Sequence, residues 1–377
     1  MFYWNEPKFL AKVLKPSPEA LTAYQTIANV YRNRFVDLIL VAVTGSNGKT
    51  STKEIIGTIL KEAFDEVLIS EGNVNNQIGV PRTLLQLNDS HKAAVIEMAS
   101  NSIGEIDILS RCGEANIAVL TNIGLTHLEG LGDIDGVARE KASIFNGLKK
   151  DGLSILNDSL VDNELIVSVC PKFISYGLTE KADYRVIYQG GDFHSSSFTV
   201  IRPEKRELSI KWTLKGSHMA ENAAAAIVIA DYLNITDEVI IRALNKIEIL
   251  PDRMQIDEIN GVLWINDSYN ANPCSVKSLI DWVVSVDKEI NYLVLGDMLE
   301  LGESGTSLHL DTINYAKEKL PNTTLLTFGK IMSSVTKDDL SFIDIDKLKD
   351  FLKEHLKSGD RIAIKGSRKM ELERLQI

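Results

Sequence analysis

Cysteine is scarce in this chain, with only Cys112, Cys170 and Cys274 among 377 residues. The three are widely spaced and odd in number, which excludes a disulfide framework and a Cys-x-x-Cys metal site and is typical of a reducing compartment. No apolar run approaches the roughly 18 residues that a membrane-spanning helix needs. The N-terminus lacks a charged segment followed by an apolar one, so we expect no signal peptide and a cytoplasmic protein.

Positive charge is also in deficit. The chain has 41 Lys and Arg against 52 Asp and Glu, for a net charge of −11. Such a chain repels nucleic acid and anionic membranes, so we expect neither as a partner, although a local basic pocket for phosphates remains compatible with it. The chain is longer than a single hydrophobic core usually supports, which predicts two or three domains.

The most informative segment is an apolar run at 38–43 that leads through Thr44-Gly45-Ser46-Asn47-Gly48-Lys49-Thr50-Ser51 into a helical pattern. Glycines in such a loop let backbone N–H groups turn toward a phosphate, and the helix adds its positive N-terminal end. Lys49 supplies a point charge, and the hydroxyl of Thr50 suits Mg²⁺. The loop departs from the general GxxxxGK[ST] pattern, which would need glycine in place of Val43. We interpret it as a nucleotide-binding P-loop; the alternative is a chance glycine-rich turn.

Strand-like and helical segments alternate along the rest of the chain. Residues 1–36 predict a leading helical segment. Strand-like runs at 38–43, 66–70, 93–98 and 117–121 predict a parallel sheet with helices on both faces. Short runs joined by turn residues within 151–215 predict a small antiparallel subregion attached to that sheet.

A second alternation begins after Pro251. Helices are expected at 220–232 and 236–246 before it. After it we expect strands at 262–266, 292–295, 324–328 and 361–364, and helices at 274–286, 306–319 and 346–356. The predicted fold is therefore α/β, with a central P-loop parallel-sheet domain at 37–250 and a smaller Rossmann-like α/β domain at 251–377. This second part lacks GxGxxG, so a dinucleotide role has no support.

Three ionisable residues in the first part of the chain are candidates for a function. Glu97 closes an apolar strand, near where ligands meet parallel sheets, so it is either a metal or water ligand or an exposed strand-end acid. His127 lies in the loop after the next strand, either as an unusual Mg²⁺ ligand or as an ordinary loop histidine. Lys141 lies in a helical segment, where a surface lysine is the alternative to a functional one.

The chain also carries a series of motifs in a fixed order. Besides the P-loop, these are the segments at 71–81, 97–106, 122–130, 216–223, 252–255, 266–273, 296–302 and 365–368. The series resembles that of the Mur ligases over about residues 37–377. Asp267-Ser-Tyr-Asn-Ala-Asn-Pro273 and Gly296-Asp-Met-Leu-Glu-Leu-Gly302 are specific to the MurF-type branch, which adds D-alanyl-D-alanine to UDP-N-acetylmuramoyl tripeptide in peptidoglycan precursor synthesis.

The resemblance implies an ADP-forming ligase in which ATP phosphorylates an acceptor carboxylate and an amine then displaces phosphate to form an amide. Implied catalytic residues are Lys49, Glu97, His127, Lys141 and Arg253. Implied nucleotide ligands are Gly45, Ser46, Asn47, Gly48, Lys49, Thr50, Ser51, Asn222, Arg253 and Asp267. Implied Mg²⁺ ligands are Thr50, Glu97 and His127, the last at a second ion. Lys141 matches a lysine that is carbamylated in many relatives, which would turn a cation into a carboxylate-like group.

Substrate contacts are implied for a further group of residues. These are Asn73, Asn76, Asn270, Asn272, Asp297, Glu300, Lys365 and Arg368. Turn formation before Pro273 is an equally good account of Asn270 and Asn272. Cys274, next to that proline, is interpreted as a bystander.

The sequence departs from the MurF pattern at its start, where about 36 residues precede the P-loop strand, too few for the usual UDP-binding domain. Three explanations follow: an acceptor without UDP, a partner protein that supplies the missing domain, or another surface that holds UDP. Two further functions compete with an amide ligase: a non-catalytic nucleotide-binding subunit and a P-loop NTPase that drives motion.

Overall fold

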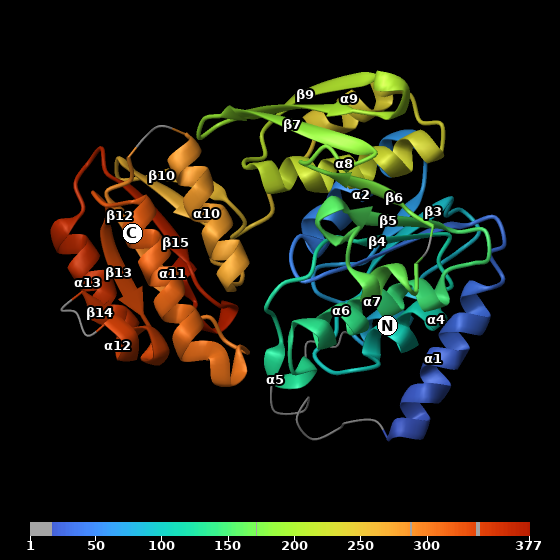
Figure 1. Ribbon diagram of the computed structural model, residues 1–377, viewed down its shortest axis with the longest axis horizontal. Helices are drawn as coiled ribbons and strands as arrows, with labels where there is room; N and C mark the ends of the chain where they lie inside the picture. Colours follow the sequence, from blue (N-terminus) through green and yellow to red (C-terminus); the bar gives the residue numbers. More distant parts are fainter. Residues whose placement is uncertain (1–16, 171, 287–288, 337–339) are drawn as a thin grey trace.

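The computed structural model describes residues 17–170, 172–286, 289–336 and 340–377. They form two sheet-based units, which we call unit A (residues 18–245) and unit B (residues 255–377) (Figure 1). Among the described residues, no helix is both long enough and apolar enough to cross a membrane.

Unit A is built on a nine-stranded sheet. The strand order is β2 (Val67–Ile69), β3 (Ala93–Glu97), β1 (Ile39–Thr44), β4 (Ile117–Leu120), β5 (Leu153–Asn157), β6 (Ile174–Gly177), β7 (Tyr184–Gly191), β8 (Ser196–Ile201) and β9 (Glu207–Trp212). Neighbours from β2 to β7 pair in parallel, and only β7–β8 and β8–β9 are antiparallel. The predicted antiparallel subregion is confirmed at β7–β9, but its extent across 151–215 was wrong. β5 and β6 extend the parallel part, because the short helix α7 (Glu164–Val167) returns the chain between them.

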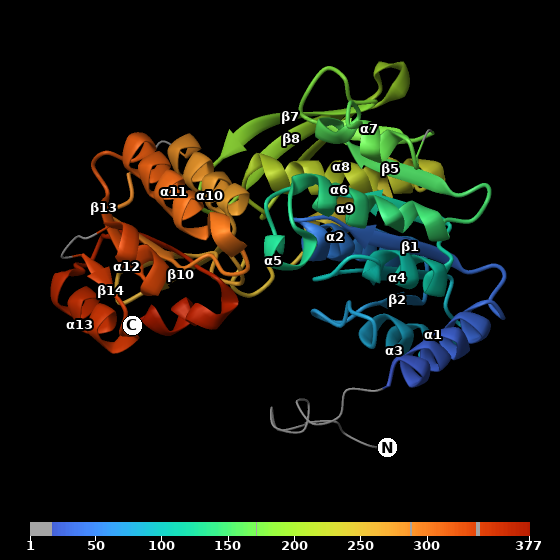
Figure 2. The same ribbon diagram turned by 60° about the horizontal axis from the view of Figure 1, so that its bottom comes forward.

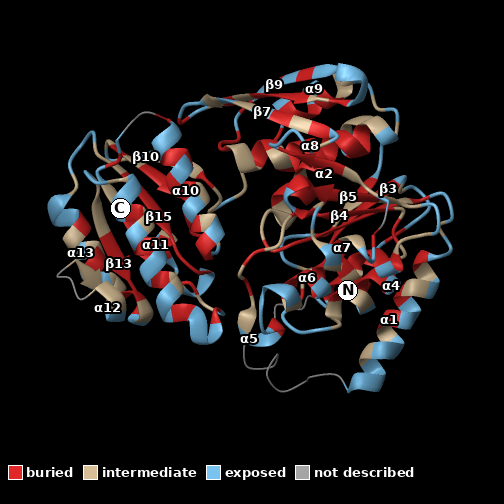
Figure 3. Cartoon of the chain, in the orientation of Figure 1, coloured by how far each residue is buried: buried red, intermediate tan, exposed pale blue. Residues whose placement is uncertain are grey.

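Helices cover both faces of this sheet because its central strands are apolar on both sides. In β1, Val41 and Val43 face one cluster, while Leu40 and Ala42 face the other. The first cluster is closed by α2 (Lys49–Ala63), α8 (Ser217–Tyr232) and α9 (Asp237–Asn245). The second is closed by α1 (Pro18–Arg32), α4 (Glu105–Gly113), α6 (Ile134–Ala142) and α3 (Gly79–Leu84), of which α1 and α3 lie side by side in Figure 2. Figure 3 shows the buried strands between these layers.

Of the leading segment at 1–36, residues 1–16 lie outside the described part of the chain. Its predicted helix is α1, which begins at a cap in which the hydroxyl of Ser17 accepts from the N–H of Ala20 at 3.3 Å. The short helix α5 (Leu128–Leu131) follows β4.

Unit B is a smaller six-stranded sheet. Its order is β10 (Gln255–Ile259), β11 (Val262–Asn266), β15 (Arg361–Lys365), β12 (Tyr292–Gly296), β13 (Thr324–Phe328) and β14 (Ser341–Phe342), parallel except for the β10–β11 hairpin. Its helices are α10 (Pro273–Ser285), α11 (Gly305–Lys319), α12 (Lys330–Thr336) and α13 (Ile345–His355). Every strand and helix predicted after 251 is present. β10, α12 and β14 were not predicted, because β14 is very short and β10 and α12 have weak apolar patterns.

A hairpin of unit A reaches unit B. In Figure 1 the ends of β7 and β8 extend toward α10. The turn between them carries Phe193, which is 4% exposed and belongs to the hydrophobic core of unit B. Its ring meets that of Trp282 edge-on, with centroids 5.8 Å apart. The two units are therefore joined by this aromatic contact as well as by the chain at 246–254.

Candidate functional site

A cavity of about 670 Å³ lies between the two units. Unit A contributes the P-loop, the loops after β3, β4, β5 and β6, and the start of α8. Unit B contributes the segment at 267–279 and residues near 300. The carboxyl ends of parallel strands therefore meet at this cavity from both sheets, which is where ligands bind in α/β folds.

The glycines of the P-loop are required by close approach. Gly48 has φ +78°, and a Cβ there would lie 2.8 Å from Oδ1 of Asn222. A Cβ on Gly45 would lie 2.0 Å from Oγ1 of Thr121. The loop is thus pressed between α8 and the end of β4, and any side chain at these two positions would displace it.

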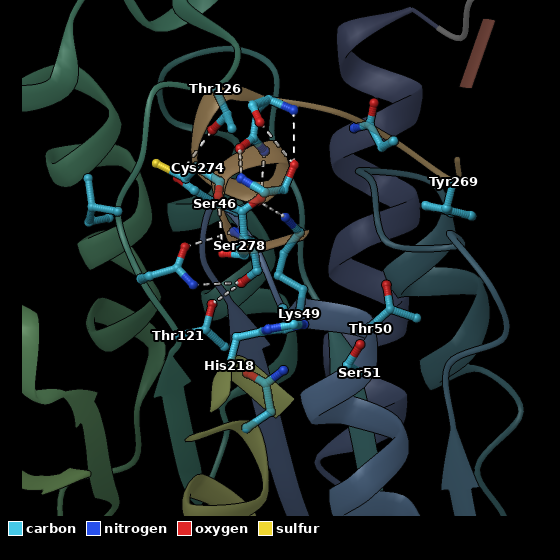
Figure 4. A pocket seen from close by; sticks show the side chains of 18 of the residues that line it. Ser46, Lys49, Thr50, Ser51, Thr121, Thr126, His218, Tyr269, Cys274 and Ser278 are labelled. Carbon is cyan, nitrogen blue, oxygen red and sulfur yellow. Dashed lines mark hydrogen bonds between the residues drawn. The ribbon is translucent and has the colours of Figure 1, made fainter. Parts of the chain in front are cut away.

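Hydrogen bonds hold the loop against the segment after β4. The N–H groups of Ser46 and Asn47 donate to the backbone and side-chain oxygens of Asn122, each at 2.9 Å. The N–H of Gly124 donates to Oγ of Ser46 at 2.9 Å, and Thr126 lies beside them (Figure 4). These N–H groups are occupied, so a phosphate would meet the first turn of α2, whose N–H groups have no partner within the helix.

Lys49 lies folded over the loop. Its Nζ donates to the carbonyl oxygens of Gly45 at 2.7 Å and Ser46 at 3.1 Å. Burial lowers the pKa of Lys49, the nearby Arg253 lowers it further, and Glu97 opposes both. The ammonium therefore stands where a phosphate could replace backbone carbonyls as its partner.

Arg253, from the chain between the units, reaches the P-loop. Its Nη2 donates to Oγ1 of Thr50 at 3.2 Å. Its guanidinium stacks on the ring of Tyr269, 4.0 Å from the centroid. The structure thus brings a fixed cation from the unit B side onto the residue that the sequence identified as a magnesium ligand.

Glu97 ends β3 and is 2% exposed. Its Oε1 accepts from Nδ2 of Asn75 at 2.7 Å, whereas its buried Oε2 has no hydrogen-bond partner among the described residues. A buried carboxylate oxygen without a partner in a cavity suits a hard cation such as Mg²⁺. Sequence reasoning missed Asn75, although it lies between Asn73 and Asn76, which were chosen.

His127 and Glu300 meet across the cavity. Nδ1 of His127 donates to Oε2 of Glu300 at 2.7 Å, and this hydrogen bond lowers the pKa of Glu300. Both residues have positive φ, 54° and 69°. Glu300 also lines the cavity, and its implied contact with substrate stays a prediction.

Lys141 is buried in α6 at 1% exposure, so it is not a helix-surface lysine. Its Nζ donates to Oγ of Ser100 at 2.8 Å and to the carbonyl of Ser100 at 3.3 Å. The neighbours of Ser100, Ala99 and Asn101, line the cavity, so Lys141 lies directly behind its wall. Burial lowers the pKa of Lys141 to about 7.

On the unit B side, Asp267, an implied nucleotide ligand, pairs with Lys365, an implied substrate residue. Asp267 binds Nζ of Lys365 through Oδ2 at 2.5 Å and accepts from the N–H of Met254 through Oδ1 at 3.2 Å. Nζ of Lys365 also donates to the carbonyl of Asn270 at 3.1 Å. Lys365 thus carries a charge that is already compensated.

The remaining predicted residues divide into two groups. Ser51, Asn73, Asn222, Asn270 and Asn272 line the cavity, as does Cys274. Asn272 caps α10 and also donates to Oδ1 of Asn47 at 2.5 Å, so it both forms a turn and joins the units.

Three predicted substrate residues make structural contacts within the protein. Oδ1 of Asn76 accepts from the N–H groups of Ile78 and Gly79 at the start of α3. The carboxylate of Asp297 accepts from the N–H of Met332 at 2.8 Å, at the start of α12. Arg368 pairs with Asp252 at 2.8 Å. Their contacts with substrate stay predictions.

Glu221 and Asn157 line the cavity beyond Asn222 and were not predicted. Nδ2 of Asn157 donates to Oε2 of Glu221 at 2.8 Å. Burial raises the pKa of Glu221 to about 7. The signal that could have found it is an acid directly before Asn222, in the first part of the alanine-rich helix α8.

Comparison with known proteins agrees with this geometry. The chain matches the Mur ligase middle domain over residues 43–230 and the Mur ligase glutamate ligase domain over residues 252–368. A UDP-N-acetylmuramoyl-tripeptide–D-alanyl-D-alanine ligase of Bacillus subtilis is 33% identical over 98% of this chain and 81% of the relative. The Haemophilus influenzae protein of the same name is 33% identical over 88% of this chain and 75% of the relative.

Solved structures of MurF are similar to both units together. MurF from Acinetobacter baumannii has a TM-score of 0.87 and 28% identity, covering 94% of this chain and 79% of that one. MurF from Thermotoga maritima in complex with ADP has a TM-score of 0.84 and 24% identity, covering 100% of this chain and 86% of that one, and supports the fold.

Proposed function

Because this chain belongs to the Mur ligase family of ATP-dependent, amide-bond-forming enzymes, we propose that it joins D-alanyl-D-alanine to a UDP-N-acetylmuramoyl tripeptide, a step of peptidoglycan biosynthesis. One observation carries the proposal: a single cavity is bounded by the P-loop of unit A and by the loops of unit B, with Arg253 bonded to Thr50 between them. We further propose that the two units are two domains, divided near residue 250, and that the enzyme works in the cytoplasm, where ATP is available.

The residues suit an activation of a carboxylate by ATP. The acceptor carboxylate oxygen takes the γ-phosphoryl group and ADP leaves; the amine nitrogen then bonds to the acyl carbon, phosphate leaves, and the nitrogen loses a proton. Such transfer depends on positioning and on neutralising crowded negative charge. We assign phosphate binding to the first turn of α2, Lys49 and Arg253, and adenosine contacts to Asn222 and Asp267.

Magnesium would be held by Thr50 and Glu97, with His127 at a second ion. The orphaned Oε2 of Glu97 fits this role. Within the described residues, no three His, Cys, Asp or Glu side chains gather as a protein-only metal site requires, so phosphate oxygens and water would complete the coordination. When bound, the ion supplies charge stabilisation at the transferred phosphoryl group.

Lys141 is proposed to be carbamylated. Carbon dioxide reacts with an unprotonated amine, and a pKa of about 7 leaves a large fraction of this buried amine unprotonated near neutrality. The product would be an anion directly behind the cavity wall. Mass spectrometry of the intact chain in bicarbonate tests this: a gain of one CO₂ that Lys141→Ala abolishes supports it.

The acceptor is the least constrained substrate. Asn73 lines the cavity, and we propose that it contacts a peptide-like acceptor. Whether the acceptor carries UDP, and whether a partner protein binds that UDP, is tested by comparing acceptors with and without the nucleotide. A KM that is the same for both supports a peptide acceptor; a requirement for a second protein supports the partner.

The function is tested by phosphate release with ATP, Mg²⁺, D-alanyl-D-alanine and the tripeptide acceptor. A ligase releases phosphate only with both substrates, yields a product of the summed mass less water, and forms a hydroxamate when hydroxylamine replaces the amine. Phosphate release that is independent of both substrates identifies an NTPase. Nucleotide binding without release identifies a non-catalytic subunit.

A further inference from the structure

The segment between β2 and α3 runs along the end of β3, where Glu97 lies. Three hydrogen bonds fasten it there: Ser70 N–H to the Val95 carbonyl at 3.0 Å, Glu97 N–H to Oγ of Ser70 at 3.0 Å, and Ala99 N–H to the Asn75 carbonyl at 2.9 Å. Glu97 is therefore bracketed by Ser70 on one side and Asn75 on the other.

A buried lysine fixes the same segment to the P-loop helix. Lys53 of α2 is fully buried, and its Nζ donates to the carbonyl of Ser70 at 2.6 Å. Its charge is balanced by Glu54 at 2.8 Å. The position of the segment relative to the P-loop is thus set by backbone carbonyls and by Lys53, one helical turn after Lys49.

The side-chain amide of Asn75 is not needed for this anchoring. The backbone of Asn75 already accepts from Ala99, and the next residue, Asn76, holds the start of α3. The amide points instead to Glu97, donating to Oε1 at 2.7 Å. One carboxylate oxygen is thereby fixed. The other is left buried at the cavity, with no hydrogen-bond partner in the part of the chain that the structure describes.

From this arrangement we infer that Asn75 is a positioning residue for the cation site, holding the Glu97 carboxylate so that Oε2 stays available to a cation that would bind in the cavity. The inference rests on the proposed function only in that a divalent cation binds with the nucleotide. A neutral amide donor suits this task because it orients the carboxylate without competing for its charge. Loss of such a partner typically weakens metal affinity 10- to 100-fold.

The test is a titration of Mn²⁺ into the full chain with ADP bound, followed by electron paramagnetic resonance. We expect Asn75→Ala to raise the dissociation constant of Mn²⁺ 10- to 100-fold. Asn75→Leu, which fills similar space without a donor, should do the same. The matched control is Gln77→Ala in the same stretch of chain. It removes a hydrogen bond of 2.9 Å from the Gln77 side-chain amide to the carboxylate of Glu105.

The control should bind Mn²⁺ as the unchanged chain does. ADP affinity in EDTA and the melting temperature report whether the variants fold. Folded Asn75 variants that bind Mn²⁺ within twofold of the unchanged chain overturn the inference, as does an equal loss in Gln77→Ala.

A kinetic readout separates positioning from general damage. Asn75→Ala should raise the Mg²⁺ concentration needed for half-maximal rate by the same factor, and saturating Mg²⁺ should restore most of kcat. A kcat that stays low at every Mg²⁺ concentration contradicts the assignment. If the unchanged chain forms no amide at all, the proposed function fails, while the Mn²⁺ titration still decides the role of Asn75.

Discussion

The two walls of the cavity are built differently. On the unit A wall, short hydrogen bonds hold the P-loop and Glu97: the N–H of Asn47 donates to Asn122, and the side chain of Asn75 donates to Glu97. On the unit B wall, charged side chains pair with one another or with an aromatic ring: Asp267 with Lys365, Arg368 with Asp252, and Arg253 with the ring of Tyr269.

This difference assigns different tasks to the walls. Hydrogen bonds with uncharged asparagine side chains fix the geometry of unit A before any ligand binds, which is what a phosphoryl-transfer site requires. Paired charges on unit B can exchange partners when phosphate or substrate brings its own charge. Direct polar contacts such as Arg253 with Thr50 and Asn272 with Asn47 join the walls, so we expect unit B to adjust on binding while unit A stays as it is.

The largest effect on activity is expected on the unit A wall, whose geometry is fixed before any ligand binds. Lys49→Ala removes the cation over the P-loop, and we predict a fall in kcat of about 10³-fold or more, as for the loss of a preorganised charge at a transition state. Steady-state phosphate release measures it. Lys61→Ala, an exposed lysine of the same helix, is the control and should match the unchanged chain. Retained activity in Lys49→Ala would overturn the P-loop assignment.

The next effect concerns the contact that joins the walls away from the cavity. Phe193→Ala empties a position in the core of unit B, which typically costs about 3 kcal/mol or more in the free energy of unfolding. Differential scanning calorimetry should show unit B melting earlier than unit A. Ile187→Ala, on the exposed side of the same hairpin, is the control. An unchanged melting profile in Phe193→Ala would mean that the hairpin does not hold unit B.

Much of unit A follows from local sequence. Continuous apolar runs predict β1, β3 and β4, and the polar residues after them predict where Lys49, Glu97 and His127 meet. Pairing between distant segments does not follow, so the parallel register of β5 and β6 was missed.

Side-chain direction is equally hard to predict. Three asparagines share the turn at 73–76, and only the hydrogen bonds to β3 decide that Asn75, not Asn76, reaches Glu97. On unit B, the motif residue Asp297 lies at the end of a strand, as Glu97 does on unit A, yet its carboxylate accepts from the backbone at the start of α12.

A smaller effect is expected from the unit B wall, where paired charges can exchange partners. Arg253→Lys keeps the charge but loses the planar fork and the stacking on Tyr269. We predict a loss of about tenfold in kcat/KM for ATP, mostly in KM, and about 30-fold for Arg253→Ala. Arg374→Ala, an exposed arginine of unit B, is the control. A loss in Arg253→Ala as large as that of Lys49→Ala would erase the distinction between the walls.

The smallest effect concerns Glu221 on the unit A wall and tests whether its side chain is uncharged in the folded chain. Burial raises the pKa of Glu221 from 4.5 to about 7. Between these values the folded chain holds a proton that the unfolded chain has released, so this group lowers stability as pH rises, and the full cost is present above pH 7. Glu221→Gln avoids that cost and keeps an oxygen for Asn157. Urea unfolding should show a gain of about 1–3 kcal/mol at pH 8 and none at pH 4. An equal gain at both pH values would place its origin in packing and leave the carboxylate charged in the fold.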